Sequence, residues 1–158
     1  MILTSPSNAI DGPWIICVRS LRCTVRAPEM FATAAYNEAV RRHFADPQHA
    51  GDLQKDHDLT LVAEVSESAE GAHIVMSAGI RGDTIAGMAF RVRGCPHLIA
   101  ALELACRILT DQPVASLENY DSANIIQELS VPVEKAGRIL LLEAALATLW
   151  AQYASDED

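Results

Sequence analysis

Three strand-like runs follow one another between residues 59 and 92, separated by short connections. They read LTLVAEV from residue 59, HIVMSAGI from residue 73 and TIAGMAFRV from residue 84. Each run is rich in residues that favour strands, and the last two are joined by Arg-Gly-Asp, which suits a hairpin with Gly82 in the turn. Runs this close along the chain pair most simply with their neighbours. The sequence therefore predicts a three-stranded antiparallel sheet.

Helical patterns lie on both sides of these runs. Apolar residues recur at helical spacing over residues 34–44, from Pro96 to about Thr110, and from about Val133 to Tyr153, and a shorter helix is expected over 122–129. A sheet followed by helices is typical of the α+β class. We expect the helices to pack on one side of the three-stranded sheet.

The first 29 residues differ from the rest of the chain. They contain several Pro and Ser residues, which are typical of turns and loops, and three arginines, and they show no sustained period of a helix or strand. We expect residues 1–29 to form a flexible N-terminal extension and residues 30–158 to form the domain. Met30 opens the periodic segment, so a natural start at Met30 is a further hypothesis.

Composition excludes several classes of function. The 158 residues are half hydrophobic, which is enough for one core, and 21 acids against 12 bases give a net charge of −9. A nucleic-acid binder needs clustered Lys and Arg, so we expect no nucleic-acid partner. Membrane spans need roughly 18 consecutive apolar residues, and none is present. We expect a cytoplasmic protein that does not enter a membrane, in which the four cysteines are free thiols.

One cysteine stands at a chemically distinctive place. Cys95 follows Gly94 at the end of the third strand-like run, and Pro96 then opens a helix. Unpaired N–H groups and the helix dipole favour a thiolate at a helix N-terminus, which makes the thiol a better nucleophile or metal ligand. Small cysteines also pack well at such junctions, so the position alone does not decide between chemistry and packing.

Three strings, in this order, resemble one family. They are YNEAVRRHFADPQHAG from residue 36, FRVRGCPHLIAALELA from residue 90 and ELSVPVEKAGRILLLEAALATLWAQY from residue 128. The chain resembles the IscU-type iron-sulfur cluster scaffolds, which include the N-terminal domain of NifU and the SufU proteins. The resemblance covers roughly residues 36–153. It implies an IscU/NifU-N-like α+β fold and a scaffold that is not an enzyme.

The resemblance also implies a ligand set that this chain keeps only in part. Members of the family hold a nascent cluster or zinc with three cysteines and a further ligand such as aspartate. Here Cys95 matches the middle cysteine, the first falls near Ala69 or Glu70, the aspartate near Gly71 and the third on Gly137. Two of the three thiols are therefore absent, and the chain resembles a degenerate member.

Other side chains could complete a site around Cys95. His97 lies two residues further on, and His73 and Glu70 lie in the segment that should hold the first ligand. One Cys, two His and one Glu would be a borderline set for zinc or iron. Cys106 is eleven residues from Cys95, or about 16 Å of helix rise, and is expected in the core. His43 and His49 are expected to be helix-end and loop residues.

Three classes of function remain open. The first is a scaffold-like protein of iron-sulfur cluster assembly that binds iron, zinc or a cluster weakly through Cys95, His97, His73 and Glu70, with a homodimer sharing one cluster as a variant. The second is a metal-free module that binds a cysteine desulfurase or other assembly proteins. The third is a thiol enzyme with His97 as base, which is disfavoured because adjacent residues of a first helical turn do not face one another.

Overall fold

The computed structural model describes residues 36–54, 56–68 and 71–156. Along these residues the elements are α1 (Glu38–Ala45), β1 (Leu59–Glu67), β2 (Ala72–Arg81), β3 (Thr84–Arg93), α2 (Pro96–Leu109), the 3-10 helix η2 (Val114–Leu117), α3 (Ala123–Glu128) and α4 (Val133–Asp156). The strands and the α2, α3 and α4 helices lie close to the predicted ranges, whereas η2 was not expected. The predicted extension over residues 1–29 lies outside the described residues, so the division at residue 30 stays a prediction.

Helix α1 begins later than the pattern predicted, because its first turn has a capping residue. The side chain of Asn37 accepts a hydrogen bond from the backbone N–H of Val40 at 2.8 Å. Residues 34–35 of the predicted helix lie outside the described part of the chain. Val40 and His43 form the buried side of α1, as the periodicity predicted.

The sheet is the predicted antiparallel meander. The strand order is β1-β2-β3, and both neighbouring pairs run antiparallel. Gly82 lies in the β2–β3 turn with φ of +57°, a conformation that glycine adopts without steric cost. The expected α+β class and three-stranded sheet are therefore confirmed.

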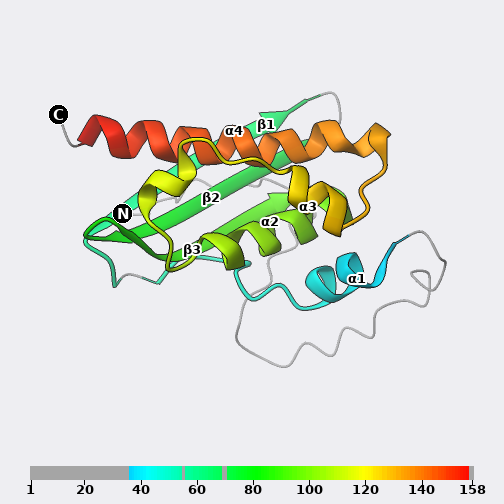
Figure 1. The fold of residues 1–158 in the computed structure, drawn as a ribbon, viewed down its shortest axis with the longest axis horizontal. Coiled ribbons are helices and arrows are strands. Elements are labelled where there is room, and N and C mark those ends of the chain that lie inside the picture. The colour runs from blue at the N-terminus through cyan, green and yellow to red at the C-terminus, as the bar shows by residue number, and fades with distance from the viewer. Residues whose placement is uncertain (1–35, 55, 69–70, 157–158) are drawn as a thin grey trace, which may run out of the picture.

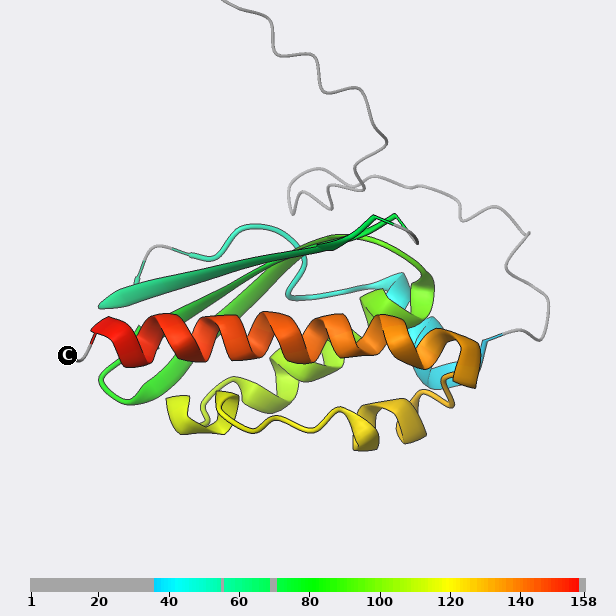
Figure 2. The same ribbon diagram turned by 90° about the horizontal axis from the view of Figure 1, so that it is seen from above.

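Helices cover one face of this sheet. Figure 2 shows α4 and α2 on the same side of the three strands. Alternate residues of β2 point toward them, and Ile74, Met76, Ala78 and Ile80 are each at most 2 % exposed. At the β1 edge, the side chain of Gln152 in α4 bonds to both the N–H and the C=O of Val62, which covers that edge.

Helix α2 is the most enclosed element of the described structure. Every residue from Leu98 to Cys106 is buried, because α1, α4 and β3 pack against different sides of the helix (Figure 1). The sequence of this stretch is correspondingly apolar on all sides, with Glu103 as the exception.

The opposite face of the sheet is crossed by the segment that follows α1. The N–H of Phe90 donates to the carbonyl of His49, and the N–H of Gly51 donates to the carbonyl of Phe90, both at 2.9 Å. These bonds attach the segment to the β3 edge. The chain then crosses to β1, where the N–H of Asp58 donates to the carbonyl of Ile80 at 3.0 Å (Figure 2).

The crossing segment is held on the sheet by His57. Its ring lies against Gly79 of β2 and near Gly87 of β3, and a Cβ at Gly79 would overlap Cγ and Cδ2 of the ring. At Gly87 the nearest ring atom would be 3.5 Å from a Cβ, which is an ordinary contact. Only Gly79 therefore has to be glycine for the ring to keep its place.

We expect Gly79→Ala to destabilise the protein by about 1–3 kcal/mol, because the added methyl group displaces the His57 ring. Gly87→Ala is the matched control and should change stability much less. Urea unfolding followed by circular dichroism measures both, and His57→Ala should restore part of the loss in the Gly79→Ala background. Equal losses for the two alanine variants would contradict this account of the contact.

Candidate functional site

The junction between β3 and α2 positions Cys95. This residue is the N-cap of α2, with φ of −80° and ψ of 160°, and its side chain makes no capping hydrogen bond. Cys95 is partly exposed. It therefore stands beside the unpaired N–H groups of the first helical turn, as the sequence predicted.

Two other segments reach the same end of the molecule. Nε of Arg93 donates to the carbonyl of Gly71 at 3.2 Å, which fixes the residue before β2 beside the end of β3. The Tyr36 ring lies 5.0 Å from the ring of His97, between centroids, and Nζ of Lys135 lies 5.6 Å from the Tyr36 centroid. The first turn of α4 is thus linked through Tyr36 to the first turn of α2.

His97 is buried rather than exposed on the first turn of α2. The residue is 2 % exposed, and its Nδ1 has no hydrogen-bond partner. Burial lowers the pKa of His97, and the charge of Lys135 lowers it further. The imidazole is therefore held neutral, which is the form that can ligate a metal.

Of the remaining members of the predicted ligand set, His73 lies within the described residues, where it pairs with Arg93 of β3, two residues before Cys95. His73 is in β2, and its Nε2 is 2.8 Å from Oε1 of Glu64 on the neighbouring strand. Glu70 lies outside the described residues. Among the residues that are described, no three His, Cys, Asp or Glu side chains are grouped so that they could hold a metal ion. The set Cys95, His97, His73 and Glu70 stays a prediction.

The positions at which the family resemblance implies ligands are open where the structure describes them. A Cβ on Gly71 or on Gly137 would have no atom within 4 Å, and Gly71 has φ of +64°. Gly137 lies on the exposed face of α4. It is two residues, or about 200° around the helix, from Lys135, which contacts Tyr36. A side chain at position 137 would therefore lie on the side of α4 opposite Lys135, away from Tyr36.

Cys106 does not contribute to this site. Its residue is fully buried in α2, and burial raises the pKa of its thiol far above the ordinary value. The expectation that Cys106 is a core residue is confirmed. Cys17 and Cys23 lie outside the described residues.

Comparison with known proteins places this chain in a family. A sequence model of the NifU-like N terminal domain matches residues 35–157. The chain belongs to this family. The iron-sulfur cluster assembly enzyme IscU of Drosophila melanogaster is 28 % identical over 138 residues, which cover 85 % of this chain and 88 % of the relative. The iron-sulfur cluster assembly scaffold protein IscU of Rickettsia prowazekii is 28 % identical over 120 residues, which cover 75 % and 92 %.

A solved structure supports the fold of this NifU-like domain. The N-terminal NifU-like protein of Brucella abortus superimposes with a TM-score of 0.60, covering 75 % of this chain and 94 % of that one. The sequence identity is 15 %, so the likeness concerns the fold. Together with the family match, it confirms the predicted IscU/NifU-N-like architecture.

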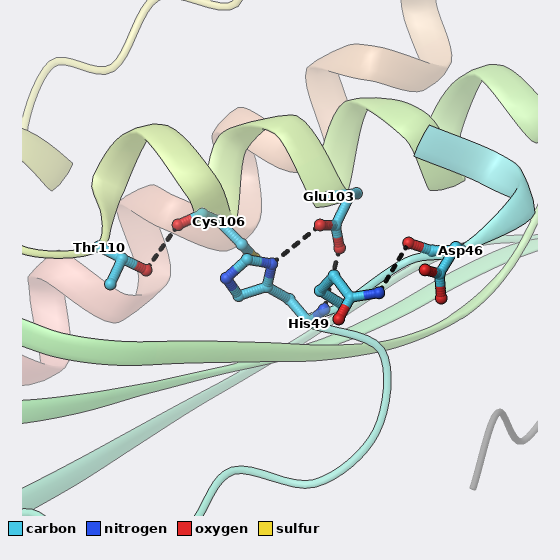
Figure 3. Close-up of polar contacts among 6 residues, drawn as sticks. Asp46, His49, Glu103, Cys106 and Thr110 are labelled. Carbon is cyan, nitrogen blue, oxygen red and sulfur yellow. Dashed lines mark hydrogen bonds and ion pairs between the residues drawn. The ribbon is translucent and has the colours of Figure 1, made fainter. Parts of the chain in front are cut away.

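The NifU-like domain contains a second polar cluster that the sequence analysis missed. Glu103 of α2 has a side chain 1 % exposed, and it accepts hydrogen bonds from the backbone N–H of His49 at 2.9 Å and from Nδ1 of His49 at 3.0 Å (Figure 3). His49 was expected to be a loop residue, and it does lie between α1 and β1. The available signal was Glu103 itself, a single acid within an apolar helix.

The carboxylate of Glu103 is ionised despite its burial. Burial alone would raise the pKa of Glu103, but the hydrogen bonds from the His49 ring and backbone outweigh this effect and lower the pKa. Since an ionised carboxylate only accepts hydrogen bonds, Nδ1 of His49 must carry the donated proton. His49 thus connects β3, through its carbonyl, to the centre of α2.

None of the described helices of the NifU-like domain is long and apolar enough to cross a bilayer.

We expect Glu103→Gln to lower the free energy of unfolding by about 1–3 kcal/mol at pH 7, because a buried charge-assisted contact is lost. A lowered folded-state pKa adds stability above the ordinary value of 4.5, and this stability disappears as the pH falls through the folded-state pKa. Urea unfolding from pH 7 to pH 3 should therefore show that the difference in free energy of unfolding between Glu103→Gln and the natural protein shrinks below about pH 4.5.

Glu64→Gln is the matched control for this measurement. Glu64 also pairs with a histidine, His73, but the Glu64 side chain is 71 % exposed. Glu64→Gln should therefore change the free energy of unfolding little. A difference between Glu103→Gln and the natural protein that stays constant over the whole pH range would contradict the assignment of an ionised Glu103.

Proposed function

We propose that this protein is a scaffold-like component of iron-sulfur cluster assembly, in which the Cys95 thiolate contacts iron or a nascent cluster as cargo. The family match over residues 35–157 supports the assembly role. The single observation that carries the role of Cys95 is its place at the N-cap of α2, partly exposed and without a capping bond. A thiolate so placed is a soft ligand of the kind that holds the iron of iron-sulfur clusters.

The candidate ligands favour weak and transient binding of iron or a cluster. One thiolate cannot complete the shell of a cluster, and the three predicted supplements, His97, His73 and Glu70, are harder ligands that favour zinc or mononuclear iron. His97 is neutral and has one unpartnered nitrogen, but it is buried. We therefore expect a labile cluster that depends on added thiol or on a homodimer in which two Cys95 thiolates share one cluster.

The proposal extends to partners and location. The relatives are named for cluster assembly, one of them as a scaffold protein, so a scaffold without catalytic activity of its own is the proposed class. A cysteine desulfurase or another assembly protein is the proposed partner. The net charge of −9 is unfavourable for nucleic acid. A cytoplasmic location remains part of the proposal.

A second candidate function is a metal-free module that keeps the scaffold surface and binds the sulfur-transfer machinery. One observation favours it: the described residues include no group of three metal-ligating side chains. In this case Cys95 would be a surface residue of the fold, and binding to the assembly proteins would not require iron.

Anaerobic reconstitution with iron and sulfide tests the proposal. We expect the natural protein to acquire a labile cluster, seen by absorbance and iron counting, and Cys95→Ser to acquire none. Cys106→Ala and the double variant Cys17→Ser, Cys23→Ser are controls that should still form it. A stable, stoichiometric cluster on a monomer would show that the ligands are misplaced, whereas no iron in any of the proteins would favour the metal-free module.

Binding to a cysteine desulfurase of the same organism separates the two candidates further. For the scaffold, we expect iron and sulfide to change the measured affinity for the desulfurase in the natural protein but not in Cys95→Ser. For the metal-free module, calorimetry should give the same affinity in both proteins, with and without iron. Absence of any binding would count against the partner named in both candidates.

A further inference from the structure

Helix α4 has an exposed face that carries no polar side chain along most of its length. Every exposed position of α4 between residues 137 and 154 is glycine, alanine or leucine, whereas α1 exposes Glu38, Arg41 and Arg42. Together with Val133, these positions form the α4 stripe, whose members are alternately four and three residues apart. The members are Val133, Gly137, Leu140, Ala144, Ala147, Ala151 and Ala154. A surface helix normally carries charged or polar side chains on this side, so the stripe is unusual for a face left in water.

The α4 stripe faces away from the core and is open to solvent. Alternating steps of four and three residues keep side chains on one side of a helix, here opposite buried residues such as Ile139 and Leu149. Val133 is 91 % exposed and Leu140 is 54 % exposed, and a Cβ at Gly137 would have no atom within 4 Å. In Figure 2 none of the described elements lies in front of α4. A contiguous apolar surface of this kind marks an interaction site.

The sizes of the side chains fit a second copy of the α4 stripe that runs in the opposite direction. Both large residues, Val133 and Leu140, lie in the N-terminal half, and the C-terminal half from Ala144 contains only alanine. In an antiparallel pair the large side chains of each copy meet the alanines of the other, as interlocking helices require. A parallel pair would set alanine against alanine and leave gaps along that half. A two-fold axis near Ala144 makes the stripe complementary to itself, which is the condition for a symmetric dimer.

The two ends of α4 carry opposite charge. The first six residues contain Lys135 and Arg138 against Glu134, and in the last six Asp156 is the one charged residue. The helix dipole has the same direction, positive at the N-terminus and negative at the C-terminus. An antiparallel pair brings each negative end beside the positive end of the partner, whereas a parallel pair places like ends together.

We propose that the α4 stripe packs antiparallel against the same stripe of a second copy of this protein, forming a symmetric dimer. The stripe from residue 133 to residue 154 is about 32 Å long, and a contact about one helix diameter wide covers roughly 300–400 Å² on each copy. Interfaces of this size hold weak and reversible complexes. The dimer therefore forms at micromolar concentrations and above, and it dissociates on dilution.

This dimer does not depend on iron or on a cluster. The first turn of α4 lies at the Cys95 end of the molecule, linked through Tyr36 to the first turn of α2. In an antiparallel pair the two Cys95 thiols therefore lie near opposite ends of a contact about 32 Å long, too far apart to share one cluster. The α4 dimer thus differs from a homodimer in which two Cys95 thiolates hold one cluster, and each copy keeps its own Cys95.

Sedimentation equilibrium on the full, iron-free chain under reducing conditions tests the proposal. We expect a reversible monomer–dimer equilibrium that is the same in the natural protein and in Cys95→Ser. Leu140→Glu should raise the dimer Kd at least about tenfold, because each dimer would then bury two carboxylates in an apolar contact. Ile108→Glu is the matched control. It replaces another large apolar residue, 46 % exposed on α2, and should leave the Kd unchanged.

Two results would overturn the proposal. One is a natural protein that stays monomeric up to about 1 mM, and the other is an equal Kd for Leu140→Glu and the natural protein. Circular dichroism verifies that the variants fold, since glutamate is compatible with an exposed helix position. Neither result bears on the role of Cys95, because iron and sulfide are left out of the measurement.

Mixtures of variants test the direction of the pairing. In the antiparallel dimer Leu140 lies near the partner's Ala147, so Leu140→Glu mixed with Ala147→Lys should regain the dimer through an ion pair. Leu140→Glu mixed with Leu140→Lys should not regain it, because the two substituted positions are then about 10 Å apart along the helices. Recovery in the second mixture but not in the first would overturn the antiparallel pairing.

Discussion

The burial of α2 is the constraint on which the rest of this structure depends. The helix is enclosed by the sheet, α1 and α4, and its residues Leu98 to Cys106 are all buried. Because a helix so enclosed cannot shift without opening the core, both of its ends and its one buried acid have fixed positions. Its first turn sets the place of Cys95, and its centre holds the Glu103 carboxylate that binds His49.

This arrangement keeps Cys95 at the rim of the core while the rest of its helix is inside. The thiol is partly exposed at a helix N-terminus, where backbone donors favour a negative charge. The neighbouring glycines at positions 71 and 137 provide no ligand atoms, and Gly137 faces solvent on α4. The fold of the family is therefore retained around Cys95, while two of the positions at which the family resemblance implies ligands carry no side chain.

Sequence reasoning succeeded where the determinants are local. Pro96 after Gly94 and Cys95 indicated a helix start, and the hairpin at Gly82 indicated the pairing of the last two strands. It did not show that His97, a candidate ligand, is buried against the Tyr36 ring. The contact depends on where α1 lies, and no spacing within α2 shows this.

The sequence by itself determined the class of fold and the position of Cys95 at a helix start, because hydrophobic period, turn residues and helix signals act over a few neighbouring residues. The family followed from the resemblance of three of its strings to the IscU-type scaffolds. Only the tertiary structure decided which polar groups meet. His49 and Glu103 are 54 residues apart and bond directly. Such relations arise from packing, in which distant segments exclude water together and leave each buried polar group to find its partner in space.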